Sequence, residues 1–270
     1  MRNNTWHIFY RWFRDRRKSI LWWNVGFVAI VVLYAAFYPL IRDYLLGGSE
    51  GVVFASGSGM DLTSPLGYLW NTLYSHEFPW VLMAYGIALG TAAIASDESS
   101  GNLEYLLSKP VTRTQIALAR YAGVFVHLLF MAFVGGLALA VSAPFFDLTT
   151  DTATSQGVTL SNIFNGTFSA FAVGLGYASI AYFIGTATGR KSHALGISTA
   201  LAIGGYVFYG LSQSSGHLEF LAWASPWRWY IESQMFIEGL DWQVALPFIL
   251  SLITVVAGWR IFLRRDLQKV

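Results

Sequence analysis

The segment SDESSGNLEYLLSKPVTRTQIALAR, residues 96–120, is a short polar stretch between two long apolar runs. Gly101 and Asn102 suit the start of a helix, and Pro110 ends it because a proline pushes the residue before it out of the helical region. Three leucines share one face of this helix at spacings i, i+3 and i+4: Leu103, Leu106 and Leu107. Two helical turns cannot bury three leucines unaided, so we expect this amphipathic helix to pack against something else.

A second helix is predicted directly after the proline. Thr112 suits its N-cap, and Gln115 three residues later completes a capping box. The apolar residues that follow continue into the next apolar run. The short amphipathic helix is therefore held on a sharp turn at the end of a long apolar segment.

The composition sets the class of protein. Of 270 residues, 55% are hydrophobic and only 12% are charged, which is too apolar for one soluble core and too poorly charged to cover it. The sequence therefore predicts an all-α integral membrane protein. The chain has no cysteine, which excludes disulfides, thiolate nucleophiles and cysteine metal sites.

Six segments are apolar over roughly the 17 to 25 residues that a bilayer requires. They are residues 20–41, 79–96, 121–143, 163–187, 194–211 and 244–263. We expect them to be six transmembrane helices of a single transmembrane domain, residues 1–270. The first is too long for a cleavable signal peptide and has no small-residue cleavage site, so we expect it to remain as a span.

The basic residues are unevenly distributed between the connections. Of the 17 Lys and Arg residues, only Arg42 and Arg228 fall in the first, third and fifth connections, where most acidic residues lie. By the positive-inside rule, both termini and residues 97–115 are expected to be cytoplasmic, in a multi-pass protein of the cell membrane. Residues 212–243 then lie outside. They are apolar but broken by Pro226, which predicts a re-entrant or interfacial helical pair, or else two surface helices packed on their own protein.

Residues 1–18 are predicted to form a helix in the cytoplasmic membrane interface. Aromatic residues recur there at helical spacing beside a cationic flank, a pattern typical of helices attracted to anionic lipid. The aromatic set is Trp6, Phe9, Tyr10 and Phe13. The alternative, a basic tail that only obeys the orientation rule, does not require this aromatic spacing.

The stretch ASDESSGNLEYLLSKPVTRTQIALARYAG resembles the cytoplasmic loop between the second and third spans of ABC-2 type transporter permeases. In that family an acidic residue, a Gly, Leu-Glu, a Leu-Leu pair, a Pro and then Ser or Thr with Arg recur in this order. The matching residues are Asp97, Gly101, Leu103, Glu104, Leu106, Leu107, Pro110, Val111, Thr112 and Arg113. The six-span layout, the N-terminal helix and the closing residues 262–267 also resemble this family. Mild departures occur at Ser99, Asn102 and Arg120, where a second acid, Thr and Lys are common.

The resemblance implies an ABC-2, type V exporter-like fold and the role of membrane subunit in an ATP-driven exporter. The short helix of the loop would then act as a coupling helix, seated in a groove of a separate nucleotide-binding ATPase subunit. The expected partner-binding residues are Asp97, Glu98, Gly101, Leu103, Glu104, Leu106, Leu107, Pro110 and Arg113. The leucines would be apolar anchors and the charged residues a rim that sets register. The alternative is a loop whose leucines dip into the inner leaflet. A second permease copy or a homologous permease would complete the transporter.

The chain contains no convincing nucleotide site. Residues 185–192, GTATGRKS, are one residue short of a phosphate loop and carry Arg190 where a glycine should precede the lysine. We read them as a positively charged cytoplasmic turn. We therefore expect no catalytic residue, metal or cofactor on this chain, ATP and Mg on the partner subunit, and no nucleic-acid partner.

The predicted spans contain almost no ionisable residues at mid-depth, which disfavours an ion-coupled secondary transporter. His127 is the one titratable candidate, and we expect it to satisfy a neighbouring carbonyl or hydroxyl group. The favoured function is therefore an exporter permease. The alternatives are an ion-coupled secondary transporter and a membrane anchor that recruits an ATPase without moving cargo. The apolar pathway favours an amphiphilic cargo.

Overall fold

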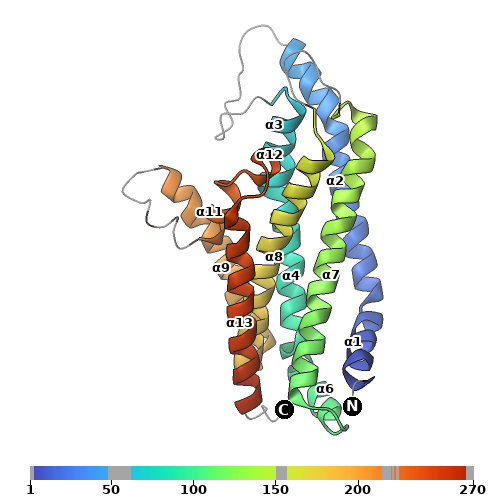
Figure 1. The fold of residues 1–270 in the computed structure, drawn as a ribbon, viewed down its shortest axis with the longest axis vertical. Coiled ribbons are helices and arrows are strands. Elements are labelled where there is room, and N and C mark those ends of the chain that lie inside the picture. Colours follow the sequence, from blue (N-terminus) through green and yellow to red (C-terminus); the bar gives the residue numbers. More distant parts are fainter. Residues whose placement is uncertain are drawn as a thin grey trace.

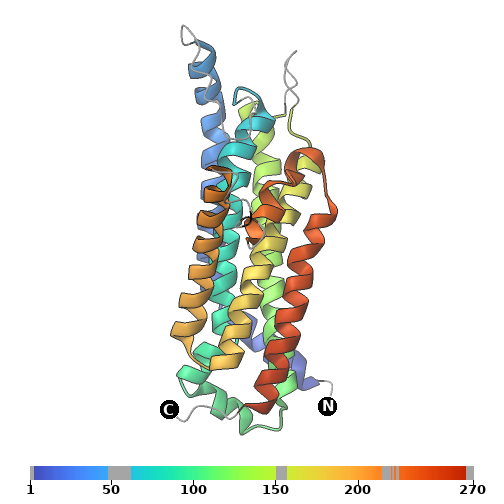
Figure 2. The same ribbon diagram turned by 90° about the vertical axis from the view of Figure 1, so that its left-hand side faces the viewer.

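The computed structural model describes residues 3–47, 62–149, 157–214, 220, 222 and 225–265, and the regular elements of this part of the chain are all helices. Long helices run side by side along the longest axis of the molecule (Figures 1 and 2). The elements are α1 Asn3–Asp15, α2 Arg17–Gly47, α3 Pro65–Leu69, the π-helix η1 Trp70–Glu77, α4 Phe78–Ala93, α5 Ala95–Ser99, α6 Asn102–Leu107, α7 Arg113–Ser142, the 3-10 helix η2 Ala143–Phe146, α8 Leu160–Thr188, α9 Lys191–Ser214, α11 Pro226–Ile231, α12 Met235–Glu238, the 3-10 helix η4 Trp242–Val244 and α13 Ala245–Arg264. The fold class predicted from the composition, an all-helical chain, is confirmed for the described residues.

Five helices in the described part of the chain are long and apolar enough to cross a membrane. They are α2, α7 with η2, α8, α9, and α13 with η4, and they contain the first, third, fourth, fifth and sixth predicted spans. The predicted second span differs. Its helix, α4, has 16 residues and ends at Ala93, because Ile94 leaves the helical conformation with φ −129° and ψ −53°. The six-span count is therefore not established by helix length and hydropathy.

The helix that contains α4 extends in the opposite direction, through polar residues. α3, η1 and α4 follow one another without a break from Pro65 to Ala93, so the helix begins 14 residues before the predicted start of the second span at residue 79. The polar side chains of η1 bond back to carbonyls one turn earlier: Asn71 to Gly67, Thr72 to Tyr68 and Ser75 to Asn71. This back-bonding allows a polar sequence to remain helical.

α8 is the central helix of the bundle, and most of its residues are buried. It contacts α4 closely, because small residues bring the two backbones together. A Cβ atom added at Gly90 would lie 2.1 Å from the carbonyl oxygen of Ala178, and one added at Gly86 would lie 2.7 Å from that of Gly174. α4 is thus packed into the interior rather than presented as a free surface helix.

α1 crosses the lower end of the bundle and packs on α7 (Figure 2). Trp12, only 1% exposed, lies over Gly123 of α7, and its ring meets that of His127 edge-on at 4.9 Å between centroids. His127 Nδ1 lies 2.6 Å from the carbonyl oxygen of Gly123, which confirms the expected backbone partner. The predicted aromatic set lies beside this contact: Trp6 and Tyr10 are exposed, and Phe9 and Phe13 are half-buried. Their membrane location stays a prediction.

The described part of residues 212–243 packs on the chain's own helices. Trp227 is fully buried, with its ring 5.0 Å from that of Trp80, and Phe236 stacks on Tyr74 at 4.2 Å. Tyr230 donates a hydrogen bond to the carbonyl of Tyr74 at 2.5 Å. These contacts favour the alternative of helices packed on their own protein, and the depth of α11 and α12 in a membrane stays a prediction. Residues 215–219, 221 and 223–224 of this segment lie outside the described part.

Candidate functional site

The helix predicted in the loop is α6, and it begins where the sequence indicates. Gly101 is its N-cap, with φ +72°, a left-handed conformation that glycine adopts without steric cost. The next helix, α7, begins with the predicted capping box: the backbone N–H of Gln115 donates to Thr112 Oγ1 at 3.2 Å, and the N–H of Thr112 donates to Gln115 Oε1 at 3.0 Å. Local sequence signals therefore fix both ends of the turn.

α6 lies at the lower end of the bundle in both views, the same end at which α13 finishes (Figures 1 and 2). Leu103 is only 1% exposed and belongs to the chain's own core, while Leu106 and Leu107 are half-buried. Leu103 therefore gives no exposed surface to a partner in this structure, contrary to its expected role as an anchor. The exposed face of α6 carries Glu104 and Tyr105 instead.

Tyr105 is a residue that the sequence analysis did not select. Its side chain is 63% exposed, and the Lys109 ammonium lies 4.7 Å from the centre of its ring. The signal that could have found it is its place between Glu104 and Leu106, on the side of α6 opposite to Leu103. We define the docking face as Glu104, Tyr105, Leu106, Leu107 and Pro110, all exposed or half-buried.

The two acidic residues of α5 are engaged within the chain. Asp97 forms an ion pair with Arg120 of α7, and both side chains are mostly buried. Glu98 is 3% exposed and pairs with Arg265 at 2.5 Å, directly after the end of α13. These carboxylates therefore do not form an exposed rim as expected; they connect α5 to two other helices.

Arg113 also faces the chain rather than an outside surface. Its Nη1 donates to the carbonyl oxygens of Phe262 at 3.1 Å and Arg265 at 2.5 Å. Arg265 in turn donates from Nε to the carbonyl of Thr186, two residues before the end of α8, at 3.1 Å. The two arginines thereby join the start of α7 and the ends of α8 and α13. Spacing in the sequence could not reveal Arg265 as a member of this site.

The phosphate-loop lookalike is a helix–turn–helix connection between α8 and α9. Gly189 ends α8 with φ +68°, and Lys191 begins α9. Ser99 of α5 donates to the Gly189 carbonyl at 3.4 Å and accepts from the Lys191 backbone N–H at 3.4 Å. This segment follows a helix rather than a strand, so it lacks the context of a nucleotide site, and our reading of it as a turn is confirmed.

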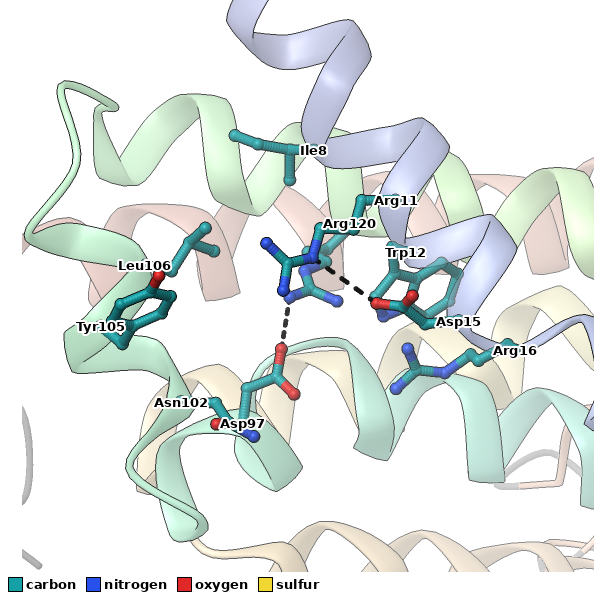
Figure 3. A pocket seen from close by; sticks show the side chains of 10 residues that line it. All are labelled: Ile8, Arg11, Trp12, Asp15, Arg16, Asp97, Asn102, Tyr105, Leu106 and Arg120. Carbon is teal, nitrogen blue, oxygen red and sulfur yellow. Dashed lines mark hydrogen bonds and ion pairs between the residues drawn. The ribbon is translucent and has the colours of Figure 1, made fainter.

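A cavity of about 260 Å³ lies between α1, α6 and α7 (Figure 3). Its charged lining consists of three guanidinium groups and two carboxylates: Arg11, Arg16, Arg120, Asp15 and Asp97. Arg16 donates to the carbonyl of Ala92 at 3.2 Å and lies 4.2 Å from the centre of the Trp12 ring. Burial lowers the pKa of Arg16, and the carboxylate of Asp97 opposes this shift. The lining of the cavity is thus charged, and it lies next to the docking face.

The structure therefore divides the predicted residues into two groups. Asp97, Glu98 and Arg113 tie α5 and α7 to neighbouring helices, whereas the docking face lies on the outside of α6 and the following turn. Partner binding by either group stays a prediction.

Two comparisons with known proteins bear on this site. The sequence profile of a family described as ABC-2 family transporter protein matches residues 58–264. The match includes α3 to α13 and therefore all of the docking face, while α1 and α2 precede it. A comparison with curated proteins found no match.

Proposed function

The chain belongs to the ABC-2 family of transporters, and on this premise we propose that it is the permease subunit of an exporter driven by a separate nucleotide-binding ATPase subunit. Membership of the family makes it a multi-pass membrane protein of an ABC transporter, a transport subunit rather than a catalytic one. Export, the coupling to ATP hydrolysis and the cargo belong to the proposal. ATP and Mg²⁺ would bind to the partner.

The observation that carries the proposal is the docking face. Glu104 and Tyr105 are exposed on a short helix whose other side, through Leu103, is buried in the bundle. A helix fixed in this way can transmit the motion of a bound partner to the helices on which it packs. An exposed aromatic ring flanked by a charge and two half-buried leucines is the composition of a protein-binding patch.

The remaining details of the proposal rest on the sequence and on the family. The basic residues support an orientation with both termini and α6 in the cytoplasm. α4 would act as the second of six spans in a type V exporter-like fold, with η1 completing its length. A second copy or a homologous permease would pair with this chain in the cell membrane, and an apolar pathway would suit an amphiphilic cargo.

Site-specific photocrosslinking tests the docking face. A photoreactive residue in place of Tyr105 should capture a polypeptide that binds ATP, while the same residue in place of Tyr44, 76% exposed near the other end of the bundle, should not. Replacing both Leu106 and Leu107 by Glu should weaken this association by about tenfold or more, equivalent to about 1.4 kcal/mol, because two charges would enter an apolar contact. Crosslinks at position 105 to lipid alone would contradict the proposal.

Turnover measurements then separate the alternative functions. In reconstituted vesicles, a permease should increase ATP hydrolysis by its partner when amphiphilic cargo is supplied. A membrane anchor would bind the ATPase without this increase. Movement of cargo driven by an ion gradient without the ATPase would indicate a secondary transporter.

A further inference from the structure

We propose that Glu98 of α5 and Arg113 of α7 are positioning residues that hold the end of α13 against the elements on both sides of α6, so that α6 and α13 move as one body. The inference deepens the proposed function, because it names a third membrane helix that the docking face would drive. The contacts concerned lie within this chain, so the first part of the test needs no partner.

The connectivity shows why such a fastening has an effect. α6 is joined covalently to α4 through α5 and to α7 through a short turn, so these two helices follow it in any case. α13 has no such connection, because Arg265 is 167 residues from Glu98 and 152 residues from Arg113. Only noncovalent contacts can make the end of α13 follow α6.

The first contact is the ion pair between Glu98 and Arg265. Glu98 is 3% exposed, and the Arg265 side chain is 17% exposed. A buried carboxylate that loses its partner is left with an unpaired charge, which makes separation of the pair costly. Arg265 also donates from Nε to the Thr186 carbonyl at 3.1 Å, and this second bond helps to keep its guanidinium oriented toward Glu98.

The α8–α9 turn closes over this ion pair. A Cβ atom added at Gly189 would lie 2.5 Å from Glu98 Oε1 and 2.7 Å from Arg265 Nη1. The glycine therefore allows the backbone to approach both members of the pair. The turn also accepts a hydrogen bond from Ser99, the neighbour of Glu98, at the Gly189 carbonyl.

The second contact is made by Arg113 to the last carbonyls of α13. The final carbonyl groups of a helix have no partner within it and carry the negative end of its dipole. Arg113 supplies a positive charge and donates to two carbonyl oxygens there, those of Phe262 and Arg265. The guanidinium lies 5.7 Å from the centre of the Phe262 ring, and Phe262 is fully buried. This contact holds the backbone of α13, while the ion pair holds a side chain.

The neighbouring ion pair provides a matched control. Asp97 is adjacent to Glu98 on α5, but it pairs with Arg120 of α7, to which α6 is already linked by the chain. Loss of this pair should loosen α5 against α7 and leave the end of α13 in place. A comparison of Asp97→Asn with Glu98→Gln therefore separates fastening of α13 from a general loosening of α5.

The test is a distance distribution between spin labels on α6 and α13. The chain has no cysteine, so Asn102→Cys on α6 and Leu263→Cys on α13, both at exposed positions, can be labelled without further changes. Electron–electron resonance in lipid nanodiscs should give one narrow distribution for the parent and for Asp97→Asn. Glu98→Gln and Arg113→Gln should each give a broader or divided distribution. Arg113→Gln leaves the buried ion pair intact and decides the question if Glu98→Gln does not fold.

Two results would overturn the inference: distributions that stay as narrow as that of the parent in both variants, or equal broadening in Asp97→Asn. The photocrosslink at position 105 is measured in the same variants and should persist in Glu98→Gln, because the docking face is unchanged. Broadening without capture of an ATP-binding polypeptide would support the fastening and contradict the proposed function. Capture without broadening would support the proposed function and contradict the fastening.

Discussion

The two ends of the bundle are held together by different chemistry. At the end that carries α6, charged groups link α5, α7, α8 and α13, with Glu98 and Arg265 at the centre. At the other end, aromatic rings join η1, α4, α11 and α12, as in the stack of Phe236 on Tyr74 and the contact of Trp227 with Trp80. Ion pairs and carbonyl bonds require particular partners at particular distances, whereas ring contacts depend mainly on buried area. The comparison indicates that the charged contacts at the α6 end fix the positions of the helices relative to one another. The aromatic contacts at the other end contribute mainly buried apolar area.

The largest loss of stability should come from a substitution at Gly90, because this residue lies in the contact between α4 and α8, two helices that connect the ends of the bundle. Gly90→Leu would push a side chain into the backbone of α8, where the Ala178 carbonyl would lie 2.1 Å from the new Cβ. Because the clash is with the backbone of α8 rather than with a flexible side chain, it cannot be relieved by a rotamer change. We therefore expect the free energy of unfolding to fall by more than about 3 kcal/mol, the upper range for overpacking. The measurement is thermal unfolding in detergent. Gly204→Ala is the control, since no atom lies within 4 Å of its added Cβ, and an equal loss in this control would contradict the prediction.

A smaller effect, confined to one end, should follow Phe236→Ala. The change removes a fully buried ring that stacks on Tyr74, and truncations of this kind cost about 3 to 5 kcal/mol. We expect the lower figure, because the short helix α12 can relax into the space. Hydrogen exchange should rise in η1 and α12 and stay low in α5 and α6. A similar rise in α5 would show that the two ends are not independent.

The smallest of the three effects should follow Arg113→Gln at the charged end. The variant loses a guanidinium that donates to two carbonyls of the α13 end, and a hydrogen bond from a charged group contributes about 1.5 to 3 kcal/mol. We expect a loss near the lower figure, since water can reach the freed carbonyls of a helix end. Hydrogen exchange should rise at the end of α13 and not in α12, the reverse of the pattern for Phe236→Ala.

Local signals in the sequence predicted the ends of α6 and the start of α7 well. Gly101, Thr112 and Gln115 determine helix ends through their own backbone and side-chain bonds, and the structure has these ends where they were expected. The five long helices follow from hydropathy in the same way. Such features depend only on residues a few positions apart.

The features that were not predicted depend on residues far apart in the sequence, or on polar side chains that hydrogen-bond to their own helix. The partner of Glu98 lies 167 residues away, so no spacing rule could assign it, and Glu98 was taken for part of an exposed rim. The second span was expected to begin only at residue 79, after the polar residues that form η1. In the structure, Asn71, Thr72 and Ser75 turn that polarity back onto their own helix.

The unequal lengths of α2 and α4 affect how the protein would respond to bilayer thickness. With 31 and 16 residues, they measure about 46 Å and 24 Å at 1.5 Å per residue, against a hydrocarbon core of about 30 Å. α2 has length to spare and can meet a thicker membrane by standing more upright. α4 alone is shorter than this core, so it would depend on η1, which continues the same helix toward Pro65, to reach across it.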